Sequence, residues 1–157
     1  MTTKIGIIAD TRIKDENEHL PKKFMGVLEG VDLIIHAGNI CLESVLIALE
    51  QLAPVEAIKG ALDNPEDFKR ELPGKKILSI EGYNIGVYNE KPSLESIKSE
   101  KIDILISGNT CIPKIDESKE IRLSLDPGSP TQPAKFDQGT MILLKLGKMT
   151  FSYIIRV

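Results

Sequence analysis

Residues 102–113, "IDILISGNTCIP", join a continuous apolar run to a loop of small and polar residues. The apolar run predicts a strand that is buried on both faces, as in a parallel sheet covered by helices. The loop "SGNTCIP" therefore lies where a strand ends, which is a common place for chemistry. It offers an amide, a hydroxyl and a thiol, with no histidine and no carboxylate. This composition suits either an active site or the remains of one.

The first half of the chain alternates strands and helices, and the second half is mostly strand. Apolar runs predict strands at 4–9, 32–36, 55–59 and 102–106, and apolar spacing predicts helices at 21–29 and 42–52. A hairpin is predicted at 76–80 and 85–88, a short helix after Ser93, and an antiparallel ending at 120–125, 140–146 and 150–156. We therefore expect an α/β fold of two stacked mixed β-sheets flanked by helices, in a single domain over residues 1–157.

Composition narrows the classes of function. The net charge of -3 argues against a basic nucleic-acid surface. The apolar run near the start is too short for a membrane span or a secretory signal. Cys41 and Cys111 form neither a disulfide framework nor a zinc motif, so reduced thiols are expected. We expect a cytoplasmic protein with no nucleic-acid or membrane partner, whereas a protein partner and a homodimer both remain open.

Five polar loops follow the predicted strands. Ligands of open α/β sheets bind beyond the carboxyl ends of the strands, so these loops are expected to converge on one patch. Their sequences are "ADTR" (9–12), "HAGN" (36–39), "KGALD" (59–63), "YNE" (88–90) and "SGNTC" (107–111).

The order of these motifs, continued by "GNTCIP" and "DPGS" (126–129), resembles the calcineurin-like metallophosphoesterase superfamily. The similarity is to its small bacterial and archaeal phosphodiesterase branch. There the strands end in D-T-H and H-A-G-D, followed by G-N-x-D, T-H-G, G-H-T-H-x-P and N-P-G-S. The resemblance implies two stacked β-sheets flanked by helices, which agrees with the fold expected above. In active members it also implies two divalent metals held by seven side chains.

The resemblance also identifies the family's ligand positions in this chain. They are occupied by Asp10, Arg12, Asn39, Ala61, Asn89, Asn109 and Cys111. Only Asp10 keeps the residue type that the family shows. Arg12 stands where a histidine ligand belongs, and Asn39 replaces the carboxylate that bridges the metals.

The other four ligand positions also carry residue types that differ from the family pattern. Ala61 replaces an asparagine, and Asn89, Asn109 and Cys111 each replace a histidine. What the chain keeps is mostly loop scaffolding: Thr11, Gly38, Gly60, Asp63, Gly108, Thr110, Pro113, Pro127, Gly128 and Ser129.

These replacements bear directly on metal binding. Two divalent cations about 3.5–4 Å apart repel each other, and a bridging carboxylate offsets this repulsion. The amide of Asn39 is neutral, and the guanidinium of Arg12 has no lone pair to donate. We expect Arg12 to pair with Asp10 and to replace a metal electrostatically, although Arg12 also suits the binding of an anion without metal.

The leading hypothesis is a phosphodiesterase-family pseudoenzyme with no catalytic residue and no metal cofactor, which acts as a binding or scaffold protein. The retromer scaffold subunit offers an analogy within the superfamily, since it resembles these phosphodiesterases and holds protein partners. One alternative is a metal-dependent phosphodiesterase, a hydrolase, with Mn, Ni or Zn weakly bound near Asp10. Another is a metal-free anion-binding protein built on Arg12. His36 is expected to be structural, and Cys111 to be a partly buried, unreactive thiol.

Overall fold

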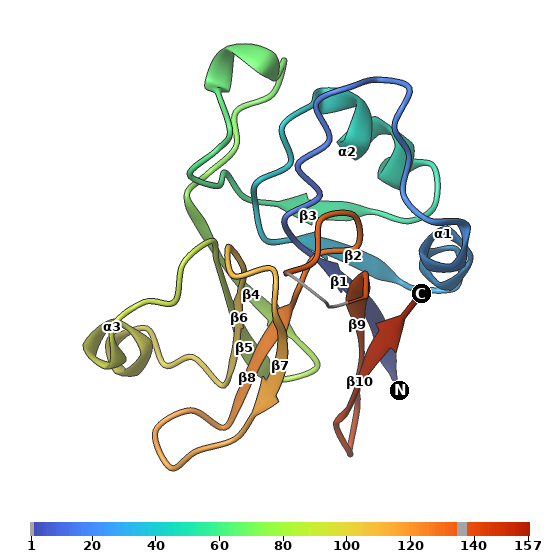
Figure 1. Ribbon diagram of the computed structural model, residues 1–157. Helices are drawn as coiled ribbons and strands as arrows, with labels where there is room; N and C mark the ends of the chain where they lie inside the picture. Colours follow the sequence, from blue (N-terminus) through green and yellow to red (C-terminus); the bar gives the residue numbers. More distant parts are fainter. Residues whose placement is uncertain (1, 135–137) are drawn as a thin grey trace.

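Two five-stranded β-sheets stack face to face, with helices outside them (Figure 1). The computed structural model describes residues 2–134 and 138–157. One sheet has the order β10-β9-β1-β2-β3 and the other β4-β5-β6-β8-β7. The strands of the first sheet are β1 (Thr3–Ile8), β2 (Leu33–His36), β3 (Val55–Ala57), β9 (Thr140–Leu146) and β10 (Phe151–Arg156). Those of the second are β4 (Lys75–Ile80), β5 (Tyr83–Tyr88), β6 (Ile104–Ser107), β7 (Pro113–Asp116) and β8 (Leu123–Pro127). The expected pair of stacked sheets is thereby confirmed.

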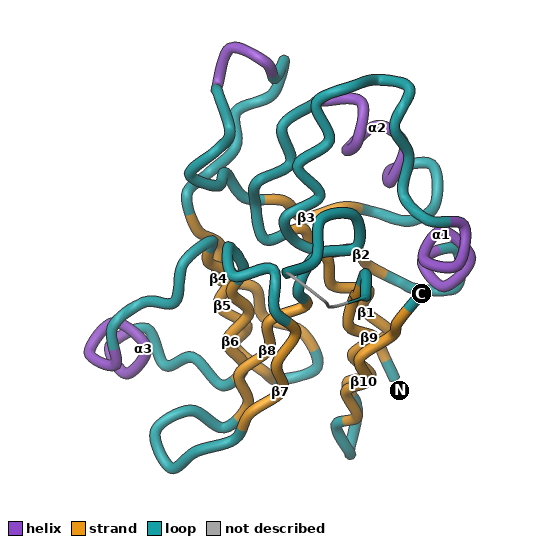
Figure 2. Tube along the Cα trace, in the orientation of Figure 1, coloured by secondary structure: helices purple, strands orange, loops and turns teal. Residues whose placement is uncertain are grey.

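The helices are short and leave much of the chain in loops (Figure 2). α1 (Lys22–Leu28) and α2 (Glu43–Glu50) lie beside the first sheet, and α3 (Leu94–Ser99) lies beside the second. A 3-10 helix, η1 (Pro65–Asp67), sits at the tip of a projecting loop. Within the described ranges, no helix has the length and apolar character needed to cross a bilayer.

Both sheets are mixed, as the sequence predicts. β1, β2 and β3 run parallel because helices connect them, while β9 and β10 add in antiparallel fashion. In the second sheet β5, β6 and β8 are parallel, and β4 and β7 form antiparallel edges. The parallel strands therefore deliver their carboxyl ends to one edge of the sandwich.

The core between the sheets is aliphatic. Ile7, Ile35, Ile106, Leu125 and Ile142 are completely buried there. A second cluster fills the space between the first sheet and its two helices, and it includes Phe24, Leu28, Ile34 and Leu46. Because β1 and β2 are buried on both faces, they appear in the sequence as continuous apolar runs rather than as alternating ones.

The sequence-based prediction misses one strand and misplaces the start of another. β7 has no counterpart among the predicted strands, because its sequence "PKID" is short and opens with Pro113. Proline lacks an N–H donor, but it is tolerated on an edge strand such as this one. The strand predicted at 120–125 begins at Leu123, since the preceding residues form the turn between β7 and β8.

The turn after β8 brings two backbone segments together. Gly128 has a φ of +69°, as the "DPGS" motif predicts. A Cβ at this position would lie 2.3 Å from Thr140 Oγ1 and 3.0 Å from the backbone nitrogen of Pro113. Gly128 thus meets a conformational and a steric requirement at once.

Alanine substitutions at Gly128, Gly82 and Gly74 separate the cost of a positive φ from the cost of the steric clash. We expect Gly128→Ala to lower the free energy of unfolding by at least ~2 kcal/mol, through backbone strain and the clash. Gly82→Ala has a positive φ but open space, so it should cost about 1 kcal/mol. Gly74→Ala has neither and serves as the control. Urea denaturation of the three variants would contradict this account if Gly128→Ala were no worse than Gly82→Ala.

Candidate functional site

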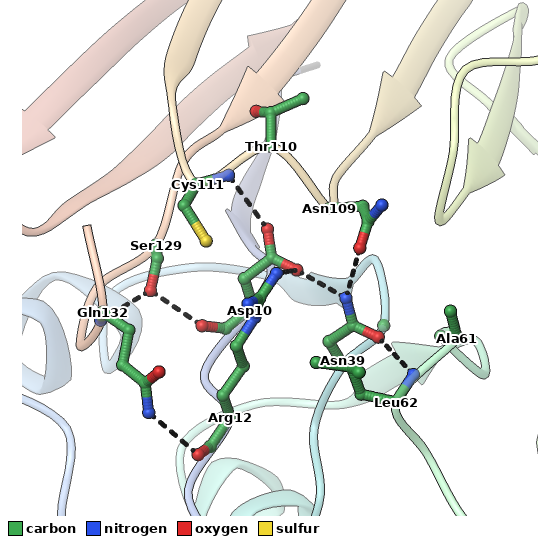
Figure 3. A network of polar contacts seen from close by, with 12 residues as sticks. Asp10, Arg12, Asn39, Ala61, Leu62, Asn109, Thr110, Cys111, Ser129 and Gln132 are labelled. Atoms are coloured by element: carbon green, nitrogen blue, oxygen red, sulfur yellow. Dashed lines mark hydrogen bonds and ion pairs between the residues drawn. The ribbon is translucent and has the colours of Figure 1, made fainter. Parts of the chain in front are cut away.

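The loops predicted to converge do so at one edge of the sandwich (Figure 3). Asp10 follows β1, Asn39 follows β2 and Asn109 follows β6, and hydrogen bonds join the three side chains. Asn89, at the end of β5, bonds to the backbone of Ala61 in the loop after β3. This convergence follows from the parallel strands, which all end at this edge.

The side chain of Asn39 is the centre of the site. Its Nδ2 donates to Asp10 Oδ1 and to Asn109 Oδ1, each at 2.9 Å. Its Oδ1 accepts the backbone N–H of Leu62 at 2.9 Å. That N–H requires an acceptor, so it fixes which end of the amide is oxygen. The amide nitrogen therefore lies between the carboxylate of Asp10 and the amide oxygen of Asn109 (Figure 3).

Asp10 is completely buried and forms the ion pair that the sequence predicts. Arg12 Nη2 lies 3.6 Å from Asp10 Oδ1, and the backbone N–H of Cys111 points to Oδ2 at 3.4 Å. Burial raises the pKa of the Asp10 carboxyl above its ordinary value. The hydrogen bond from Asn39 and the charge of Arg12 act in the opposite direction. The side chain of Arg12 is 25% exposed, so the pair lies at the edge of the solvent.

The remaining ligand positions hold the loops together. Asn89 Nδ2 donates to the carbonyl of Ala37 at 3.0 Å, and its Oδ1 accepts from the Ala61 N–H at 3.1 Å. Ala61 contributes only its backbone. Cys111 is buried, and burial, helped by the nearby Asp10 carboxylate, raises the pKa of its thiol. A protonated thiol is a poor nucleophile, which agrees with the expectation for Cys111.

Asp63 clamps the loops after β2 and β3. Its Oδ1 accepts the N–H groups of Ile40 and Cys41, and its Oδ2 accepts those of Asn39 and Gly60, at 2.8–3.0 Å. One buried carboxylate thus satisfies four backbone donors. The sequence identifies Asp63 only as a residue that the family pattern retains, because a clamp of this kind has no local signature.

A third group fastens the loop after β1. Ser129 Oγ donates to the carbonyl of Asp10 at 2.7 Å, Thr131 Oγ1 donates to the carbonyl of Thr11, and Gln132 Nε2 donates to the carbonyl of Arg12 at 3.1 Å. The "DPGS" motif signals Ser129 in the sequence. Nothing there signals the contacts that follow it, because they depend on the tertiary approach of two loops.

These clamps hold a backbone that is strained in a regular way. Three loops each carry two non-glycine residues of positive φ, spaced two apart: Asp10 and Arg12, Asn39 and Cys41, and Asn109 and Cys111. Such residues cost about 1–3 kcal/mol each and persist only when the surroundings impose them. Hydrogen bonds between the loops, such as Asp10 N–H to the carbonyl of Gly38 at 3.0 Å, supply part of that constraint.

His36 has a structural role next to the site, as the sequence predicts. Its Nδ1 accepts the N–H of Gly38 at 3.1 Å, so its Nε2 carries the proton and donates to Thr11 Oγ1 at 3.0 Å. Complete burial lowers the pKa of His36 from 6.5 to about 3. The ring is therefore neutral and links the loops after β1 and β2.

The described residues offer few metal-ligating groups at this site. No cluster of three or more His, Cys, Asp or Glu side chains within 2–134 and 138–157 is placed to hold a metal ion. The polar groups at the centre are instead two amides, one carboxylate and one guanidinium. Chemically, the arrangement is a network of hydrogen bonds with the guanidinium of Arg12 at its rim, and the buried Nε of that guanidinium has no hydrogen-bond partner in the described chain.

The Asp63 clamp yields a stability prediction. In Asp63→Asn, an N–H₂ group faces backbone donors that have lost an acceptor, and buried unsatisfied groups of this kind cost about 1–3 kcal/mol each. We expect the free energy of unfolding to fall by roughly 3 kcal/mol in guanidinium denaturation. Asp67→Asn, at an exposed position in η1, is the matched control and should change little. Equal stability of the two variants would contradict the clamp.

The buried His36 yields a pH prediction. Its folded-state pKa is depressed, so the unfolded state binds more protons between pH 6.5 and about 3. Stability contributed by the neutral ring is present above pH 6.5 and is lost as the pH falls through this window. His36→Asn keeps an acceptor for the Gly38 N–H but removes the titrating group. Denaturation across this range should show a steeper acid loss in the native protein than in the variant, and parallel curves would contradict the assignment.

Comparison of the sequence with known proteins identifies the family of this chain. The family model described as the calcineurin-like phosphoesterase superfamily domain matches residues 3–149. A probable metallophosphoesterase from Methanothermobacter thermautotrophicus is 34% identical, over 97% of this chain and 91% of that protein. Another, from Methanocaldococcus jannaschii, is 39% identical over 84% of this chain and 70% of that protein.

Solved structures show the same fold at lower identity. Vacuolar protein sorting 29 from Cryptosporidium parvum has a TM-score of 0.82 and 23% identity, covering 99% of this chain and 92% of that one. A structure described as a novel archaeal phosphodiesterase has a TM-score of 0.70 and 22% identity, covering 97% of this chain and 99% of that one. With the sequence matches above, these findings establish that this chain belongs to the calcineurin-like phosphoesterase superfamily.

Proposed function

We propose that this chain is a phosphodiesterase-family protein that has lost the two-metal catalytic centre and acts as a binding or scaffold protein. The single observation that carries the proposal is the amide of Asn39. Its nitrogen donates to Asp10 and Asn109 at the centre of the site, where active relatives of this family are expected to place a bridging carboxylate. An N–H₂ group repels a cation, whereas a carboxylate attracts one.

The residues present do not fit a pair of divalent cations. To offer its oxygen to a metal, Asn39 must give up the N–H of Leu62, which then has no acceptor. Arg12 adds a fixed positive charge 3.6 Å from Asp10, which is the only carboxylate among the seven family positions. Burial raises the pKa of the Cys111 thiol, which disfavours the thiolate that metals bind. Phosphoryl transfer through metals therefore has no support from these side chains.

A binding role is supported by what the chain retains. The loops keep a strained and fully clamped arrangement, which rigid presentation of a surface requires as much as catalysis does. The structural likeness to vacuolar protein sorting 29, a protein named for sorting rather than hydrolysis, is consistent with this role. The alternatives are a metal-dependent phosphodiesterase with an atypical ligand set and a metal-free anion-binding protein built on Arg12.

Metal content and turnover test the proposal together. We expect the purified protein, incubated with Mn²⁺, Ni²⁺ or Zn²⁺ and then dialysed, to hold far less than one metal per chain by elemental analysis. It should not hydrolyse bis(p-nitrophenyl) phosphate above the buffer rate. Stoichiometric metal with turnover would establish the phosphodiesterase instead. Thermal stabilisation by inorganic phosphate without metal, lost in Arg12→Gln, would establish the anion-binding protein.

A restored variant serves as the positive control for this measurement. It carries Arg12→His, Asn39→Asp, Ala61→Asn, Asn89→His, Asn109→His and Cys111→His. Because the variant restores the residue types of the family pattern on the same overall fold, we expect it to bind metal in calorimetry while the native protein does not. Its folding is checked by thermal denaturation. Equal metal uptake by the two proteins would show that the six replacements do not decide metal binding.

A further inference from the structure

The outer face of the first sheet is covered over only part of its length. Leu28 of α1 packs directly on Gly6 in β1, where a Cβ would lie 2.4 Å from its Cδ2 atom. Met141 and Ile155 belong to the same covered region, beneath the helices. Towards the start of β1 this cover ends and the sheet face is open.

The open part of this face carries lysines beside large apolar side chains. In the strand register Lys4 lies opposite Lys145, and Lys145 lies opposite Phe151, so the three form one row across β1, β9 and β10. Tyr153 continues the same face of β10. The basic aromatic face is defined by Lys4, Lys145, Lys148, Met149, Phe151 and Tyr153, which together with Thr2 line a shallow hollow of about 580 Å³.

The charge of this face is not neutralised within the described chain. None of the three lysines forms an ion pair with a carboxylate of residues 2–134 or 138–157. The carboxylate of Asp32 accepts the backbone N–H of Lys4 at 2.8 Å rather than forming an ion pair with its side chain. The chain as a whole has a net charge of -3, whereas this face carries three lysines without an ion-pair partner and is therefore locally positive.

The apolar side chains of this face are unusually accessible. Phe151 is 44% exposed, Tyr153 is 45% exposed and Met149 is 68% exposed. The Lys145 Nζ lies 5.7 Å from the centre of the Tyr153 ring, close enough for a cation–π contact. Aromatic residues and methionine are enriched at protein interfaces, where they act as anchors, so this composition is typical of a docking surface.

We propose that the basic aromatic face binds an acidic peptide segment that also carries an aromatic or aliphatic side chain. The lysines attract the carboxylates, and Phe151 and Tyr153 receive the apolar side chain in the hollow. A second copy of this chain is disfavoured as the occupant, because a twofold interface sets this face against itself and brings two sets of three lysines together with no carboxylate among the defining residues. The concave shape favours a side chain inserted from a peptide over the flat surface of a membrane.

This inference rests on the proposed binding role, but it concerns the end of β1 remote from the candidate site. Lys4 stands near the start of this strand and Asp10 follows its end, six residues and roughly 20 Å along the chain. Failure of peptide binding would therefore leave the metal and turnover measurements as they stand, and the reverse also holds.

Fluorescence anisotropy with a defined probe tests the proposal on the full chain. The probe is a short fluorescein-labelled peptide in which Glu alternates with Phe, and its control has Lys in place of each Glu. We expect the acidic peptide to bind and the basic one not to, with affinity falling as salt is raised. Lys145→Glu combined with Lys148→Glu should weaken binding about tenfold, and Phe151→Ala should also weaken it.

Two further comparisons decide whether this face is responsible. Lys91→Glu combined with Lys119→Glu makes the same change of charge at exposed loops of the other sheet, and it should leave the affinity within about twofold. Thermal denaturation verifies that each variant is folded. Equal weakening by both double variants would overturn the proposal. So would binding to phosphatidylserine vesicles or to single-stranded oligothymidylate without binding to the acidic peptide.

Discussion

The buried carboxylate of Asp63 accepts hydrogen bonds from four backbone N–H groups, and the candidate site depends on this constraint. These donors come from the loops after β2 and β3, which would otherwise leave polar groups unpaired in the interior. The carboxylate fixes Asn39 and Cys41 in left-handed conformations that they would not adopt alone. Hydrogen bonds within the protein thus contribute directly to the arrangement of these loops.

A single amide side chain links the polar groups at the centre of the candidate site. In a two-metal centre the cations draw carboxylates and imidazoles together by charge. Here the amide nitrogen of Asn39 performs the same linking by donating to Asp10 and Asn109. Arg12 supplies the positive charge that offsets the buried carboxylate of Asp10. The charge of Arg12 thus offsets that of Asp10, while the buried carboxylate of Asp63 is stabilised by backbone N–H donors.

Much of the fold follows from the sequence, because its strongest signals are local. The continuous apolar runs of β1, β2 and β6 identify strands buried on both faces, and the polar residues after them identify the edge where the loops meet. β7 escapes prediction because an edge strand of four residues has no such run. The ion pair of Arg12 with Asp10 could be expected from charge alone. The clamps by Asp63 and Gln132 could not, since each joins loops that are distant in sequence.

The two ends of β1 carry opposite chemistry, and this contrast follows from the way the sheet is covered. At its carboxyl end most polar groups have partners within the described chain, although the buried Nε of Arg12 has no hydrogen-bond partner there. At its amino end the helices stop short, and lysines without an ion-pair partner in the described chain lie beside exposed aromatic rings. Free energy of binding comes from groups that folding leaves unsatisfied or exposed. The open face of β1, β9 and β10 therefore offers accessible lysines and aromatic rings for recognition, whereas the side chains of the candidate site are largely engaged in contacts within the chain.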